Sequence, residues 1–244
     1  MGQYVLMWLS FIAMIVVNIL SETLPINGQT TAEISHRLDV YFTPAGYVFS
    51  IWTLIYILLA IWLVLQYKKV KTGEFNSKIG WLFILSCLFN IGWLYTWHYE
   101  QFIWSMILMF LLLFTLIGIY LQYSPSESKL SQRLPFSFYL AWISVATIAN
   151  MSYVLKYYDV SLGIPEVLGS LILVVIASTL AYMALVNSMD PIFVLVIVWA
   201  LIGIAVKTTN EAMEYGTLIV TALLVVASLL TWGFHKKNHT KSKG

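Results

Sequence analysis

The residues of this chain that could do chemistry are aromatic and amide side chains at helical spacing, and the chemistry they suit is binding. Phe49, Trp52 and Tyr56 follow one another at intervals of three and four, which places them on one face of a helix. Trp52 and Tyr56 fall in the middle of an uncharged run over residues 40–67. An indole at mid-membrane packs between helices or lines a cavity, because lipid-exposed Trp prefers the headgroup level. Both interpretations are open at this point.

Two further segments carry a similar stripe. Asn90 shares a helix face with Trp93 and Trp97, at offsets of three and seven, and Asn150 flanks a stripe that begins at Trp142. Amides in membrane helices usually hydrogen-bond across helices, contributing about 0.6–2 kcal/mol each, so interhelical bonding is the simpler interpretation of the asparagines. Three aromatic stripes with polar atoms nearby also predict a pocket for a large, mostly apolar ligand.

The groups that most catalytic mechanisms require are missing from the centres of the apolar runs. No run has Asp, Glu, Lys or Arg at its centre, whereas ion-coupled carriers and proton pumps normally use such groups. The four histidines lie at the ends of runs or between them, and no metal-ligand spacing, nucleophile elbow, phosphate loop or dinucleotide fingerprint occurs. The sequence predicts no metal site and no required cofactor.

The composition places these stripes in membrane helices. Hydrophobic residues make up 60% of the 244-residue chain and charged residues only 10%, against about a quarter in soluble domains. Seven uncharged runs reach roughly 17 residues, and the run 191–206 is slightly shorter, with Lys207 able to snorkel at its end. We therefore predict an all-α integral membrane protein with eight spans, at residues 2–21, 40–67, 79–99, 101–126, 134–155, 167–189, 191–206 and 215–234.

The basic residues set the expected orientation. If the spans alternate, ten of the thirteen Lys and Arg residues fall on the side of the two termini, including a basic tail at residues 236–244. The positive-inside rule then predicts that both termini are cytoplasmic. The net charge of +2 is too small to indicate a nucleic-acid partner, and lipid is the expected neighbour of the span ends.

The longest and most polar connection follows the first span, at residues 22–41. A connection of this length among short turns is typically functional, for example as a lid over a pocket, with a solvated linker as the alternative.

Three stretches resemble the TspO/MBR family, the tryptophan-rich sensory proteins that include the translocator protein. Residues 44–56, Pro-Ala-Gly-Tyr-Val-Phe-Ser-Ile-Trp-Thr-Leu-Ile-Tyr, are similar to the second-helix signature of that family. Residues 89–93, Phe-Asn-Ile-Gly-Trp, resemble its third-helix motif, and residues 138–150, Phe-Tyr-Leu-Ala-Trp-Ile-Ser-Val-Ala-Thr-Ile-Ala-Asn, its fifth. The resemblance covers residues 1–160 and implies a TspO-like five-helix bundle, to which residues 161–235 add three spans.

The chain also departs from the family pattern at four positions. Ala45 stands in place of a second proline, Tyr47 in place of a tryptophan, Ser50 in place of proline or glycine, and Val154 in place of another tryptophan. The loss of two pocket tryptophans argues against the ligand affinity and the light-dependent chemistry that are typical of the family.

The resemblance implies a receptor or sensor that binds a porphyrin-like or other large apolar ligand inside the bundle, in a bacterial cell membrane. It also leads us to expect a homodimer. His36 and Arg37 are the available donors for ligand carboxylates at the mouth. The alternatives are a transporter or permease of apolar molecules, and a light-dependent porphyrin-degrading enzyme with Trp52 and Trp142 as its redox-active residues. The candidate ligand-binding residues are Tyr47, Phe49, Trp52, Tyr56, Asn90, Trp93, Trp97, Trp142 and Asn150.

Overall fold

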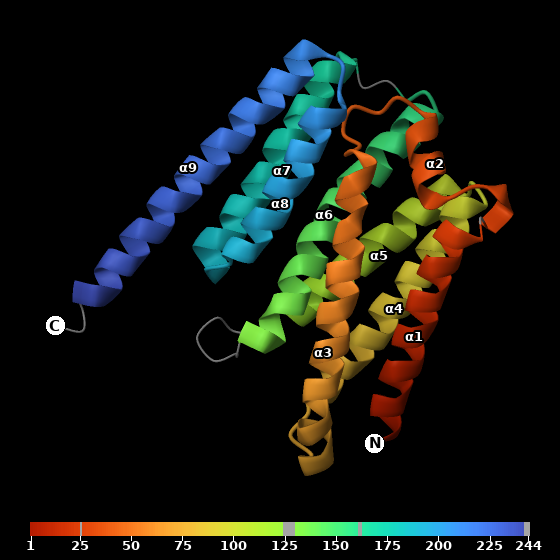
Figure 1. The fold of residues 1–244 in the computed structure, drawn as a ribbon, viewed down its shortest axis with the longest axis vertical. Coiled ribbons are helices and arrows are strands. Elements are labelled where there is room, and N and C mark those ends of the chain that lie inside the picture. Colours follow the sequence, from red (N-terminus) through yellow and green to blue (C-terminus); the bar gives the residue numbers. More distant parts are fainter. Residues whose placement is uncertain (25, 124–129, 161–162, 242–244) are drawn as a thin grey trace.

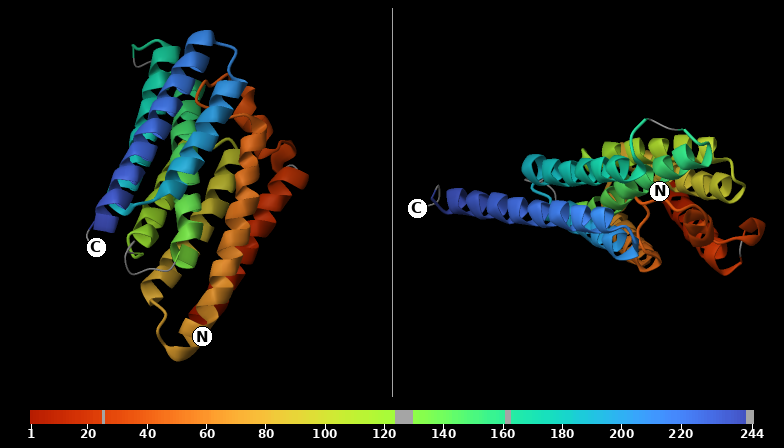
Figure 2. Two further views of the ribbon diagram at one scale, coloured as in Figure 1. Left: turned by 60° about the vertical axis from the view of Figure 1, so that its left-hand side comes forward. Right: turned by 90° about the horizontal axis from the view of Figure 1, so that it is seen from above.

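The structure, a computed structural model, describes residues 1–24, 26–123, 130–160 and 163–241, with the backbone alone from residue 235 onward. It is a bundle of long helices (Figures 1 and 2). The long helices are α1 (Gly2–Thr23), α3 (Ile51–Thr72), α4 (Ser77–His98), α5 (Phe102–Tyr120), α6 (Leu130–Tyr157), α7 (Glu166–Ser188), α8 (Pro191–Lys207) and α9 (Glu211–Lys241). Short elements precede α3, namely η1 (Ile26–Gly28), α2 (Thr31–Arg37) and η2 (Gly46–Ser50).

Each of the eight predicted spans corresponds to a helix among the residues that the structure describes. Seven are long and apolar enough to span a bilayer, and α8 is a shorter apolar helix of 17 residues. Leu9, Phe114 and Leu223 are among the large apolar side chains that remain more than half exposed on the outside of the bundle, which in a membrane means contact with lipid. Helix α1 begins, and α9 ends, at the end of the bundle opposite α2 (Figure 1).

The second span begins later than the sequence predicts. Residues 40–45 are not helical, and Gly46 opens a 3-10 turn, so the α-helix starts only at Ile51. Pro44 and Gly46 are therefore outside α3. Trp52, expected in the middle of the span, lies in the first turn of α3 near the end of the bundle that carries α2, which we call the α2 end.

Local sequence signals account for several helix boundaries. Gly73 ends α3 with a left-handed backbone (φ 77°) that favours glycine, and the Asn76 side chain then accepts the Lys78 backbone N–H at 3.0 Å to cap α4. Asp190 caps α8 by accepting the backbone N–H groups of Ile192 and Phe193, and Pro191 occupies the first helical position, where no N–H is needed.

The chain forms two groups of helices joined through α8. Helices α1, α4, α5 and α6 pack in series, with α3 against α6, while α7, α8 and α9 pack on one another. Helix α8 also lies along α6, as Figure 1 shows. The predicted boundary near residue 160 falls next to residues 161–162, which lie outside the described residues, as do residues 242–244 of the predicted tail.

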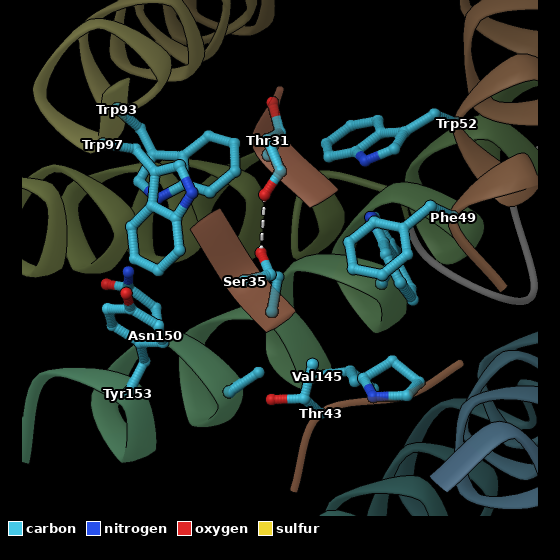
Figure 3. A pocket seen from close by; sticks show the side chains of 14 residues that line it. Thr31, Ser35, Thr43, Phe49, Trp52, Trp93, Trp97, Val145, Asn150 and Tyr153 are labelled. Atoms are coloured by element: carbon cyan, nitrogen blue, oxygen red, sulfur yellow. Dashed lines mark hydrogen bonds between the residues drawn. The ribbon is translucent and has the colours of Figure 1, made fainter. Parts of the chain in front are cut away.

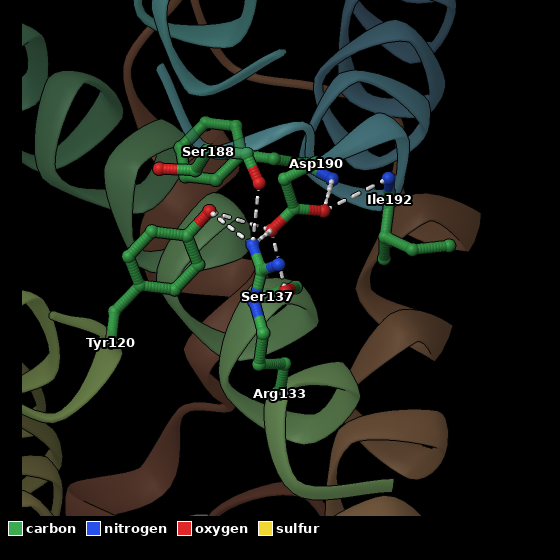
Figure 4. A network of polar contacts seen from close by, with 7 residues as sticks. Tyr120, Arg133, Ser137, Ser188, Asp190 and Ile192 are labelled. Carbon is green, nitrogen blue, oxygen red and sulfur yellow. Dashed lines mark hydrogen bonds and ion pairs between the residues drawn. The ribbon is translucent and has the colours of Figure 1, made fainter. Parts of the chain in front are cut away.

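A buried polar cluster joins the two groups at the end opposite α2 (Figure 4). Tyr120 Oη donates to Asp190 Oδ2 at 2.7 Å, and Ser137 Oγ donates to the same oxygen at 2.6 Å. Arg133 Nη2 lies 3.7 Å from this carboxylate and donates to the Ser188 backbone oxygen at 2.9 Å. Asp190 is only 3% exposed, so a residue expected at the end of a span is in fact buried between α5, α6 and α8.

Candidate ligand-binding site

An aromatic pocket lies between α3, α4 and α6, beneath α2 (Figure 3). We call it the inner pocket. Its volume is about 50 Å³. The inner pocket is lined by Thr31, Ser35, Thr43, Pro44, Phe49, Trp52, Trp93, Trp97, Trp142, Val145, Ala146, Ala149, Asn150 and Tyr153.

The rings of the inner pocket pack against one another. Trp52 meets Trp142 edge-to-face with a centroid separation of 6.2 Å, and Phe49 meets Trp142 in the same way at 5.6 Å. Trp93 and Trp97 are stacked at 6.0 Å on the other side of the pocket, as Figure 3 shows. Aromatic faces and edges at these separations suit a flat, apolar ring system.

Four buried polar atoms of the inner pocket have no hydrogen-bond partner among the described residues. Three are the indole N–H groups of Trp93, Trp97 and Trp142, and the fourth is Asn150 Oδ1. Asn150 uses its amide nitrogen instead, which donates to Ser105 Oγ at 3.3 Å. Because buried polar groups are nearly always satisfied, three donors and one acceptor are available to a bound molecule or water.

A larger cavity adjoins the inner pocket and opens between α1 and α3. We call it the outer cavity. Its volume is about 530 Å³, within the range of small-molecule sites, and Thr31, Phe49, Trp52 and Trp93 line both spaces. The inner pocket alone is too small for a macrocycle, so a large ligand would occupy the outer cavity and reach the indoles at its deep end.

Helix α2 covers the pocket and is fastened at both ends. Thr30 and Glu33 form a capping box at its start, and Thr31 Oγ1 lies 3.1 Å from Nε2 of His98, which is 1% exposed. At its other end Arg37 donates to Glu100 Oε1 at 2.6 Å and to Tyr153 Oη at 3.3 Å. The connection predicted as a lid thus folds over the pocket.

The ion pair with Glu100 stabilises the charged form of Arg37. The hydrogen bond to Glu100 raises the pKa of Arg37 above its ordinary value, so it stays cationic at any working pH. Of the two donors expected at the mouth, Arg37 is occupied by Glu100, and the exposed His36 has its Nδ1 2.8 Å from the Ala32 backbone oxygen.

The structure brings together most of the residues expected to bind ligand. Phe49 and Trp52 line both spaces, and Tyr56 lines the outer cavity, stacked on Trp52 at 5.5 Å. The members found in the inner pocket but not the outer cavity are Trp97, Trp142 and Asn150, and Trp93 belongs to both.

Two of the expected residues lie elsewhere. Tyr47 is 45% exposed and packs edge-to-face on Trp199 of α8 at 5.3 Å, outside both linings. Asn90 is fully buried, and its Oδ1 accepts the Asn18 amide N–H at 2.8 Å, so it bonds α1 to α4. That bond matches the simpler of the two interpretations.

Several residues of the site were not anticipated from the sequence. Thr31 and Ser35 reach the inner pocket from α2, and His98 anchors that helix from below. The capping signature Thr-x-x-Glu at Thr30 could have located α2, but its contact with His98 joins positions 67 residues apart and leaves no local signal.

Breaking the ion pair at the end of α2 should speed ligand release. If a porphyrin ester is used as a probe of the pocket, we expect its dissociation rate to rise up to about fivefold in Glu100→Gln, since a partly exposed pair contributes roughly 0.2–1 kcal/mol. Stopped-flow measurement of release checks this. Asp39→Asn, which removes an exposed carboxylate of the same connection, is the control, and equal rates in both variants would show that the pair does not hold the lid.

Fold and site together define a helical membrane protein with an aromatic pocket inside its N-terminal group of helices, under the first loop. A family model described as TSPO-like protein matches residues 4–234. The chain therefore belongs to the TSPO-like protein family. The match includes α7, α8 and α9, so the family likeness is not confined to residues 1–160 as the motifs alone suggested. Comparison with curated proteins gave no match, and comparison with solved structures gave none either.

Proposed function

We propose that this protein is a membrane receptor of the sensor type, which binds a porphyrin-like or other large apolar ligand across the outer cavity and the inner pocket. The observation that carries the proposal is a set of buried indole N–H groups at the deep end of an aromatic cavity, none of which has a hydrogen-bond partner among the residues that the structure describes. Stacking supplies affinity for a flat ring system, and the indoles and Asn150 supply polar partners that orient it.

Titration of the protein with protoporphyrin dimethyl ester tests this proposal. The purified protein, in nanodiscs of phosphatidylcholine, is titrated in the dark while Trp fluorescence is followed, and then illuminated while porphyrin absorbance is followed. Saturable quenching with stable absorbance supports a receptor. Absence of saturation would refute the proposal.

Two other outcomes would point to the alternatives. Protein-dependent bleaching under light would favour a porphyrin-degrading enzyme, whose candidate redox-active residues Trp52 and Trp142 lie edge to face with ring centroids 6.2 Å apart. Protein-dependent movement of the ester between donor and acceptor liposomes would favour transport.

Trp142→Phe tests the role of the indole N–H directly. The ring remains aromatic, but the donor is lost, and we expect the affinity for the ester to fall by up to about tenfold, the equivalent of one net hydrogen bond. Porphyrin absorbance gives the dissociation constant independently of Trp content. Trp104→Phe is the matched control, because Trp104 is 60% exposed on the outside of α5. An equal change in both variants would argue against the pocket.

A further inference from the structure

The chemical character of the ligand can be inferred from the outer cavity, and this inference rests on the proposed function. We propose that the ligand is a lipid-soluble amine, an apolar ring system with a cationic group placed beside Glu22, and that ligands with carboxylates are disfavoured. The apolar walls of the cavity, the hydrogen-bond acceptors on its α1 wall and the charge of the α2 end each support this.

The outer cavity opens on a side of the bundle that faces lipid. Ile19 of α1 and Ile57 of α3 line it and are 53% and 52% exposed. The two helices make few contacts with each other, which leaves the space between them accessible. A molecule that fills this cavity is therefore largely apolar.

The polar groups that α1 presents to the cavity are acceptors. Asn18 donates its amide N–H groups to the Met14 backbone oxygen and to Asn90 Oδ1, each at 2.8 Å. Ser21 and Thr23 donate their hydroxyl hydrogens to backbone oxygens one turn earlier. What remains for a ligand on this wall is oxygen lone pairs, together with the exposed carboxylate of Glu22.

Glu22 is the one charged residue among the described residues that line the outer cavity. On the opposite wall the Tyr56 hydroxyl is buried and has no hydrogen-bond partner among the residues that the structure describes. Both groups can accept a hydrogen bond from an ammonium or amine N–H. The Tyr56 hydroxyl can also donate, so the discrimination comes from Glu22, which attracts a cation and repels a carboxylate.

The net charge of the α2 end also favours a cationic ligand over an anionic one. Three basic side chains at this end, Arg37, Lys156 and Lys207, are already engaged, the first two with carboxylates and the third with the Val40 backbone oxygen. With histidines neutral, eight carboxylates against these three cations leave a net charge of −5. The carboxylates belong to Glu22, Glu33, Asp39, Glu100, Asp159, Glu166, Glu211 and Glu214. An electronegative mouth attracts cations and repels anions.

One macrocycle in three charge states tests the inference. The probes are protoporphyrin, its dimethyl ester and its bis(2-aminoethyl) amide, titrated into the full-length protein in phosphatidylcholine nanodiscs. We expect the amine form to bind at least about tenfold tighter than the dicarboxylate, with the ester between them. Raising the salt concentration from 0.05 to about 0.5 M should narrow the difference.

The variant Glu22→Gln tests whether Glu22 causes the difference in affinity between the amine and dicarboxylate probes. Glu22 is exposed in the last turn of α1, so the substitution preserves the fold. We expect the ratio between amine and dicarboxylate affinities to fall at least about threefold, with the ester unchanged. The control Glu211→Gln removes an exposed carboxylate that adds to the net charge of the same end but does not line the cavity, and should change the ratio much less than Glu22→Gln does.

The outcomes separate this inference from the proposed function. If all three probes bind with equal affinity, or the dicarboxylate binds tightest, the inference is overturned while ligand binding stands. If Glu211→Gln changes the ratio as much as Glu22→Gln, the assignment to Glu22 is wrong. If none of the three saturates, the proposed function itself fails, and the inference fails with it.

Discussion

Replacing Asp190 by alanine is expected to destabilise the protein by about 3–5 kcal/mol, the cost of breaking a buried ion pair on one side. Asp190 accepts hydrogen bonds from Tyr120, Ser137 and two backbone N–H groups of α8, and it faces Arg133. Without the carboxylate, Arg133 is left 12% exposed with its charge uncompensated, and α8 loses its cap.

Thermal unfolding in detergent, followed by the loss of helical circular dichroism, measures the effect of Asp190→Ala. Asp190→Asn keeps an acceptor for the cap but loses the charge, so it should fall between the wild type and the alanine variant. The double variant Arg133→Met with Asp190→Asn should recover part of the loss, because no buried charge is then left unpaired. Equal stability of the wild type and Asp190→Ala would show that the cluster does not join the two helix groups.

The number of spans could be read from the sequence because a bilayer imposes a minimum length of uncharged helix. Most residues that were predicted to share an aromatic stripe do lie next to each other, because helical spacing decides which side chains share a face. Trp93 and Trp97 keep that relation in α4. These features depend on local sequence alone.

Errors in predicting the second span and its site residues arose where the backbone is not a regular α-helix. Tyr47 was expected at the site because it stands where the family has a tryptophan, but it lies in the 3-10 turn Gly46–Ser50 that precedes the regular helix, and it packs on Trp199 instead. That turn also shortened α3 and moved Trp52 to its first turn. An uncharged run shows where a span can lie, but not where regular helix begins within it.

Long-range pairings were the other source of error. Asn90 shares a face with Trp93 as expected, but α1 covers that position and supplies Asn18 as its partner. Asp190 and His98 both stand at helix ends, where charged or polar groups are usually solvated, yet both are buried by segments distant in sequence. Whether such a residue is buried, and which partner it bonds, depends on how whole helices pack together.

The second large effect is expected at Gly203 of α8, whose contacts extend to the wall of the inner pocket. A side chain at this position would overlap the Cγ2 methyl group of Val48, which is fully buried and stiff because it is β-branched. The Gly203 backbone oxygen also accepts the Ala45 N–H at 3.1 Å, and Trp199 Nε1 donates to the Val48 backbone oxygen at 3.3 Å. Helix α8 therefore holds the segment that carries Phe49.

We expect Gly203→Val to displace this segment and to weaken binding of protoporphyrin dimethyl ester by about tenfold or more, since overpacking typically costs 1–3 kcal/mol. Porphyrin absorbance measures the affinity, and circular dichroism checks that the helices persist. Gly169→Val is the control, because a side chain at Gly169 of α7 meets nothing within 4 Å.

Shortening the side chain of Val48 should restore binding, so Gly203→Ala combined with Val48→Ala is expected to bind better than Gly203→Ala alone. Wild-type affinity in Gly203→Val would mean that α8 does not support the pocket. The expected loss would assign α8 a structural part in ligand binding.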